Sequence, residues 1–110
     1  MSRHIARVEH DGQPSVVVAG YDRPLSRLFL YVVRGDSEIP SPENALIYDS
    51  LLQLRLDWTD INTVADKLAA LGIEVPASMI EQIYLDQCFN AGNRLVEHHV
   101  DRPPTVLYAG

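Results

Sequence analysis

Two histidines lie between two carboxylates in the segment EHHVD, residues 97–101, which is the densest group of chemically capable side chains in the sequence. Imidazole and carboxylate groups ligate zinc and act as general acids and bases. On an extended strand, Glu97, His99 and Asp101 share one face, and His98 lies on the other. Residues two apart on a strand are separated by roughly 6.6–6.8 Å, so the Cα atoms of Glu97 and Asp101 would be roughly 13 Å apart. The strand alone therefore does not close a metal site.

A complete metal site would need a further donor from another part of the chain. His4 and His10 lie in the first predicted strand, which can be a neighbour of the strand that carries the two later histidines. We favour the interpretation that His98 faces the core or its rim and hydrogen-bonds to the backbone, and that the rest of the segment is a solvated polar face. The alternative is a small metal-dependent enzyme or metal sensor. Its candidate ligands are His98, His99, Glu97 and His4.

Cysteine chemistry is limited, because Cys88 is the only cysteine in the chain. It excludes an intrachain disulfide and a cysteine-rich zinc site. On the predicted second helix, Ile80, Tyr84, Cys88 and Ala91 form one stripe, which predicts that Cys88 is a small, unreactive core residue. Glycine-rich phosphate loops, serine nucleophile elbows and the His-Glu-x-x-His motif are all absent from the sequence. We therefore expect no catalytic residue and no cofactor.

The second helix carries a binding candidate. Asp86 and Asn90 belong to a narrow polar stripe, and Leu85 and Phe89 lie beside it, on the far side from the apolar stripe. A helix with apolar side chains on both sides of a narrow polar stripe is expected to pack against more than one other element or chain. Either the leucine-rich segment 52–56 covers Leu85 and Phe89, or they contact a protein partner, since exposed aromatic side chains mark interfaces. A small-molecule site between the helices and the sheet is a further alternative, with Asp86, Asn90 or Asn93 as polar groups.

Two loops are further candidates for recognition. Tyr21, Asp22 and Arg23 precede Pro24 in a turn and can form a binding tip, because binding residues concentrate on loops held by a rigid scaffold. Residues 35–44 contain two prolines, two serines and three acidic residues, and we expect a mobile acidic loop. This loop is either a solvated connection or a docking segment for a basic partner.

The pattern of apolar residues defines the elements that must position these groups. Asp11-Gly12 predicts a two-residue hairpin turn, with Pro14 opposite Glu9. The hairpin spans residues 4–20. Further extended segments are predicted over residues 27–34, 45–48, 52–56, 93–101 and 105–109.

Between the segments 52–56 and 93–101, the apolar period changes from two to 3.6, which predicts two helices. The first begins at Thr59 or Asp60 and ends at Gly72. The second begins at Ser78-Met79-Ile80-Glu81, which matches a capping box, and ends before Gly92. The order β-β-β-β-α-α-β-β predicts a single α+β domain over residues 1–110. Its largely antiparallel sheet of about four to six strands would carry a two-helix hairpin on one face.

Composition and charge narrow the possible functions. Nine Lys and Arg against 15 Asp and Glu give a net charge of −6, which argues against binding to nucleic acids or anionic membranes. No apolar run approaches the roughly 20 residues that span a bilayer, and the first residues do not resemble a secretory signal, so we expect a cytoplasmic protein. The size and general character of the sequence favour a bacterial origin. The leading hypothesis is a non-catalytic interaction module that binds itself as a homodimer or binds another protein, for example as an acidic inhibitor of a basic partner.

Overall fold

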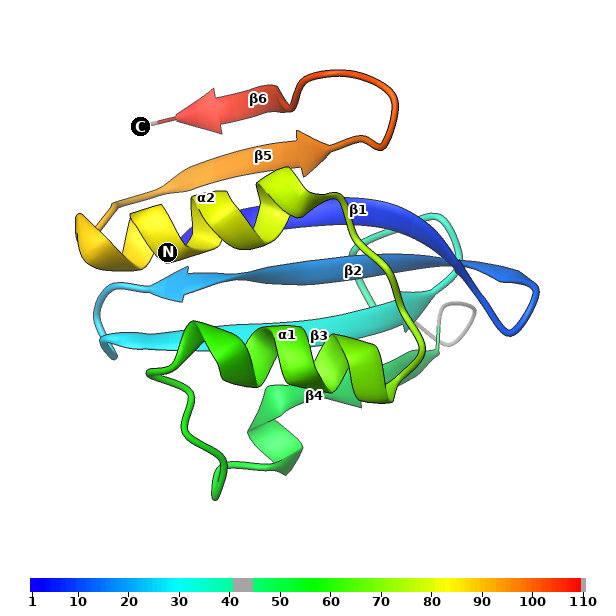
Figure 1. Cartoon of the computed structure of the whole chain (residues 1–110), viewed down its shortest axis with the longest axis horizontal. Coiled ribbons are helices and arrows are strands. Elements are labelled where there is room, and N and C mark those ends of the chain that lie inside the picture. The colour runs from blue at the N-terminus through cyan, green and yellow to red at the C-terminus, as the bar shows by residue number, and fades with distance from the viewer. Residues whose placement is uncertain (41–44, 110) are drawn as a thin grey trace.

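The computed structural model describes residues 1–40 and 45–109, which form one sheet with two α-helices on one of its faces (Figure 1). The predicted mobile loop at 35–44 therefore lies partly outside the described residues. The α+β fold class and the order of the elements are confirmed. The elements are β1 Ser2–His10, β2 Gln13–Asp22, β3 Arg27–Arg34, β4 Leu46–Asp49, the 3₁₀ helix η1 Ser50–Leu52, α1 Ile61–Ala70, α2 Ala77–Cys88, β5 Arg94–His98 and β6 Thr105–Ala109.

The six strands that the structure describes are ordered β4-β3-β2-β1-β5-β6, and every neighbouring pair is antiparallel except β1 and β5. The predicted hairpin is confirmed: Asp11 and Gly12 form its turn with φ of 53° and 74°, and Glu9 lies opposite Pro14. Positive φ at both turn positions is what Asp and Gly tolerate best. Because β5 returns to pair with β1, the first strand lies in the interior of the sheet.

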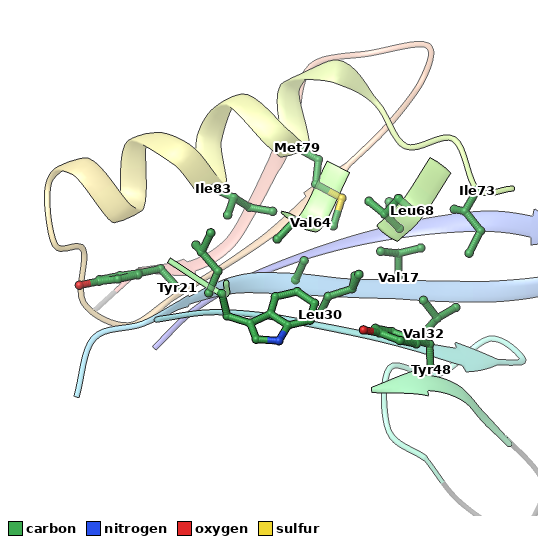
Figure 2. Close-up of a cluster of buried hydrophobic side chains, with 14 residues drawn as sticks. Val17, Tyr21, Leu30, Val32, Tyr48, Val64, Leu68, Ile73, Met79 and Ile83 are labelled. Atoms are coloured by element: carbon green, nitrogen blue, oxygen red, sulfur yellow. The ribbon is translucent and has the colours of Figure 1, made fainter. Parts of the chain in front are cut away.

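The main core lies between the sheet and the helices. Figure 2 shows its principal side chains, which are Val17, Leu30 and Val32 from the sheet, Val64 and Leu68 from α1, and Met79 and Ile83 from α2. Asp60 caps α1, as predicted, since its carboxylate accepts the backbone N–H of Asn62. Neither helix in the described part of the chain combines the length and the apolar character needed to cross a membrane.

The opposite face of the sheet carries a smaller apolar cluster. Ile5, Val16 and Val18 are buried there, with Phe29 and Tyr31 packed partly over them. The Phe29 and Tyr31 rings stack with centroids 6.3 Å apart. This face is therefore covered mainly by the side chains of the sheet itself, whereas the helices lie on the other face (Figure 1).

Two predicted strands differ from the structure. The segment 52–56 is not extended: the Asp49 carboxylate accepts the N–H of Leu51 and starts η1, and the Trp58 indole donates to the Gln53 carbonyl and closes a compact loop. The strand predicted over 93–101 ends at His98, and Val100 is 92% exposed. In both places the alternating apolar pattern predicted a strand, but local hydrogen bonds or solvent exposure of the side chains prevail.

Candidate functional site

The side chains of His4 and His98 lie next to each other beneath α2. Parallel pairing of β1 with β5 places His4 opposite Val96 and Ala6 opposite His98, so both histidines face the helix-covered side of the sheet. The two residues are 0% and 2% exposed, and their ring centroids are 5.0 Å apart. His98 thus faces the core, as expected, but it bonds to side chains and not to the backbone.

Four side chains form a continuous hydrogen-bonded chain, called the relay below: Ser78, His98, His4 and Asp86. The Ser78 hydroxyl lies 2.8 Å from Nδ1 of His98. The other ring nitrogen of His98, Nε2, lies 2.7 Å from Nδ1 of His4. Nε2 of His4 lies 2.6 Å from Oδ2 of Asp86. The relay therefore links the start of α2 to a buried carboxylate two turns further along the same helix by way of two strands.

The inner end of the relay is a buried carboxylate with several donors. Nη1 of Arg94 donates to Oδ1 of Asp86 at 3.0 Å, and Nε2 of His4 lies 2.6 Å from Oδ2 of the same carboxylate. Burial by itself raises the pKa of Asp86, but the hydrogen bonds from His4 and Ser2 and the positive charge of Arg94 together lower it below the ordinary value. Asp86 is therefore ionised at neutral pH.

His98 is neutral at pH 7. Burial lowers the pKa of His98 to about 4, and the positive charge of Arg94 adds to this effect. With an ionised Asp86 and a neutral His98, the hydrogen bonds fix one arrangement of protons when His4 is also neutral. Nε2–H of His4 donates to Asp86, Nε2–H of His98 donates to His4, and the Ser78 hydroxyl donates to Nδ1 of His98. Among the described residues, no buried side-chain nitrogen or oxygen lacks a partner.

Ser78 is where the relay reaches the surface. This half-buried residue lies at the edge of a hollow of about 590 Å³ between the start of α2 and the β5–β6 connection. The hollow is lined by Glu74, Val75, Pro76, Ala77, Ser78, His99, Val100, Arg102, Pro103 and Pro104. The predicted capping box is wrong here, since Pro76 is the N-cap and no side chain caps α2. The hydroxyl that would cap the helix is instead bonded to His98.

The four candidate metal ligands divide between two groups. All four ring nitrogens of His4 and His98 are hydrogen-bonded within the relay. His99 and Glu97 form a separate pair at 3.7 Å. In the residues that the structure describes, no group of three or more His, Cys, Asp or Glu side chains is placed to hold a metal ion. The metal site therefore stays a prediction, and its four candidate ligands do not surround one point in the structure.

The binding tip predicted at residues 21–23 has to be corrected. Tyr21 is 5% exposed and belongs to the core, because its ring lies on the helix-covered face of β2. Its hydroxyl donates to Oδ1 of Asn90 at 2.8 Å, at the end of α2. Arg23 is exposed in the turn. Thus Tyr21 and Asn90, predicted as separate binding residues, contact each other and join β2 to α2.

The orientation of α2 also differs from the prediction. Met79, Ile83 and Asp86 are its buried residues, while Cys88 is exposed, so the prediction of a buried cysteine is wrong. Asp86 bonds to His4 and Arg94. Because of these bonds, the polar stripe of α2 faces the sheet and Cys88 faces outward. The apolar spacing along the helix did not reveal this, because the partners of Asp86 lie on strands far away in the sequence.

Leu85 and Phe89 are not covered by the segment 52–56. Leu85 is 41% exposed and Phe89 is 79% exposed, so the intrachain explanation offered for this pair is wrong. A hollow of about 380 Å³ does lie between the helices, but it is lined mainly by apolar side chains of α1 and the 72–75 connection. Asp86, Asn90 and Asn93, the polar groups expected for a small-molecule site, do not line it.

Comparison of the chain with models of protein families, with curated proteins and with solved structures finds no match. Two features of the molecule remain as starting points for function. They are the exposed apolar surface beside Phe89 and the relay that ends at Ser78.

Proposed function

We propose that this chain is a cytoplasmic interaction module that acts by protein–protein contact, and that the partner is a second copy of the chain. One observation carries the proposal. The edge strand β6 and the neighbouring flank of α2 both expose uncharged, apolar side chains. Edge strands offer unpaired backbone groups to another chain, and proteins that avoid such pairing protect the edge with charge, proline or a β-bulge. The strand β6 has a register shift against β5 but neither charge nor proline.

The flank of α2 near β6 can be identified from its contacts. Ser78, Gln82, Leu85 and Phe89 are spaced as one stripe along the helix. Two members of the stripe bond to β5, since Ser78 lies against His98 and Gln82 accepts a longer hydrogen bond of 3.5 Å from Arg94. Leu85 and Phe89 therefore lie on the flank directed toward β5 and, beyond it, β6.

The strand β6 contributes the second part of this surface. All five of its residues are exposed, including Val106 at 56%, Leu107 at 49% and Tyr108 at 48%. The strand contains no charged residue and no proline. Within the described residues it has a strand neighbour on one side only, because it is the last strand of the sheet. We call Leu85, Phe89, Val106, Leu107 and Tyr108 the β6 surface.

A second copy suits the β6 surface because the strand is complementary to itself. Antiparallel pairing of β6 with its copy about a two-fold axis brings the same uncharged residues together, with Val106 on the helix-covered face and Tyr108 on the opposite face because of the register shift between them. No like charges meet along the strand. The net charge of −6 opposes self-association, but charges farther apart than about 8 Å are largely screened at physiological salt.

The test is the concentration dependence of molecular mass for the full chain, measured by sedimentation over about 1–100 μM. We expect a dimer whose dissociation constant rises at least about tenfold in Phe89→Asp and in Leu107→Lys. The matched control is Leu52→Lys, at a residue that is 77% exposed on η1, away from β6, and it should leave the dimer unchanged.

Three outcomes contradict the proposal. A folded wild-type chain that stays monomeric throughout this range would exclude the second copy as partner. A dimer that Leu52→Lys weakens as much as Phe89→Asp would place the contact elsewhere. A basic protein that binds the monomer, and whose binding Phe89→Asp abolishes, would show that the partner is this basic protein and not a second copy.

A further inference from the structure

We propose that Ser78 is a nucleophile for acyl transfer and that the hollow beside it accepts an ester or thioester with a short aliphatic acyl chain. This inference is independent of the proposed contact through β6, and it departs from the expectation that the chain has no catalytic residue. It rests on the relay geometry and on the composition of the hollow.

The relay allows a serine hydroxyl to lose its proton. A serine is a weak nucleophile until an adjacent base accepts that proton, and the base must itself be oriented by a third group. Here Nδ1 of His98 lies 2.8 Å from the Ser78 hydroxyl, and His4 holds the opposite nitrogen of the same ring. Burial makes His98 by itself a weak base, but it can pass a proton on to His4. The resulting imidazolium then lies 2.6 Å from the Asp86 carboxylate, which stabilises it.

The start of α2 supplies donors for a developing oxyanion. The first N–H groups of a helix have no partner within the helix. No side chain caps α2, and the N–H of Met79 is the first in this helix that bonds back, to the Pro76 carbonyl. The N–H groups of Ala77 and Ser78 precede it, at the edge of the hollow. Backbone donors in this position stabilise the negative oxygen of a tetrahedral intermediate.

The lining of the hollow indicates the class of substrate. Six of its ten residues are apolar: Val75, Pro76, Ala77, Val100, Pro103 and Pro104. Such a wall favours an aliphatic chain over a charged acyl group. A volume of about 590 Å³ is sufficient for a small ester.

The reaction takes place in two balanced halves. The oxygen of Ser78 forms a bond to the carbonyl carbon, and the carbonyl electron pair moves to the oxygen. The hydroxyl proton passes to His98, and the Nε2 proton of His98 passes to His4. When the intermediate collapses, the bond to the leaving alcohol or thiol breaks, and the leaving group takes the proton back through the relay. A water molecule then attacks the acyl-serine by the same route and releases the carboxylic acid.

The test uses the full chain and a fluorophosphonate ester, which reacts with activated serines. Peptide mass spectrometry should find one adduct, on Ser78, and Ser78→Ala should abolish it. Ser37→Ala is the control, because Ser37 lies on the loop after β3, and it should leave labelling unchanged. His98→Gln should reduce the labelling rate by about 100-fold or more, which is the range for loss of a general base.

Folding and reactivity are separated by recording the circular dichroism melt of each variant. If Ser78→Ala is folded and is labelled like the wild type, or if the folded wild-type chain is not labelled at Ser78, the proposal is overturned. It is also overturned if folded His98→Gln is labelled at the wild-type rate. Hydrolysis of p-nitrophenyl butyrate, lost in Ser78→Ala and retained in Ser37→Ala, is the expected catalytic readout.

Discussion

The helix-covered face of the sheet has two halves that are packed with different side chains. Beneath α1, the contacts are hydrocarbon: Val64 and Leu68 pack with Leu30 and Val32 of β3. Beneath α2, beside Met79 and Ile83, lie two imidazoles, a carboxylate and a guanidinium. The same layer of the fold is therefore an apolar core at one end and a polar network at the other.

The difference shows how each half responds to change. In an apolar cluster, losing one side chain leaves a cavity, and the cost depends on how far the neighbours can collapse. In a buried polar network, losing one member leaves its partners without hydrogen bonds in a medium of low dielectric, and the remaining groups cannot turn to water. The α2 half should therefore be the more sensitive to single substitutions, and it should be the half that depends on pH.

The largest effect is expected from Asp86→Ala. This change leaves His4 without an acceptor and removes the buried partner of Arg94, so we expect the free energy of unfolding to fall by about 4 kcal/mol. The measurement is urea unfolding at pH 7. Asp66→Ala, at an exposed acidic residue on α1, is the control and should change stability by less than about 0.5 kcal/mol. A loss below about 1 kcal/mol for Asp86→Ala would show that the network relaxes without cost.

An intermediate effect is expected in the apolar half from Leu68→Ala. Leu68 is 3% exposed, and a buried Leu→Ala change with partial collapse should cost about 3 kcal/mol. Leu52→Ala, at the exposed η1 position, should cost far less in the same urea titration. The loss for Leu68→Ala should be equal at pH 7.5 and pH 4.5. If it depends on pH, then the two halves are coupled and the contrast drawn between them fails.

The smallest effect is expected from acidification of the wild-type chain. The pKa of His98 falls from 6.5 to about 4 in the folded state, so the unfolded chain binds a proton first as pH decreases. Stability is therefore full above about pH 6.5 and declines toward pH 4, with a loss of roughly 2 kcal/mol by pH 4.5. The lowered pKa of Asp86 acts in the same direction at still lower pH. His98→Gln should remove most of the decline above pH 4.5, and an unchanged pH profile in that variant would assign the decline to other groups.

Local signals in the sequence were sufficient for most of the fold. Asp11-Gly12 predicted the hairpin and its register, and Asp60 with Gly72 predicted the bounds of α1, because each signal acts on backbone within a few residues. The order of the elements followed from the change in apolar period near Thr59. These interactions are formed by neighbours in sequence, so the sequence contains them directly.

The candidate site could not be predicted in the same way. Ser78 matches a capping signal and Cys88 matches a core stripe, yet the structure bonds Ser78 to a residue 20 positions away and turns Cys88 outward. His4 and His98 are separated by 94 positions, and their contact depends on which strand lies beside β1. The polar stripe that contains Asp86 was visible in the sequence. What the sequence lacked was the identity of the surface that the stripe faces.

Parallel pairing of β1 with β5 also orders events during synthesis. The ribosome synthesises β1 well before β5, so one edge of β1 and the imidazole of His4 have no strand partner there until residues 94–98 emerge. Parallel pairs of such long separation are slow to close, and an unpaired strand is open to wrong neighbours in the meantime. The nascent chain therefore has its greatest need of chaperone protection between the emergence of β2 and the emergence of β5.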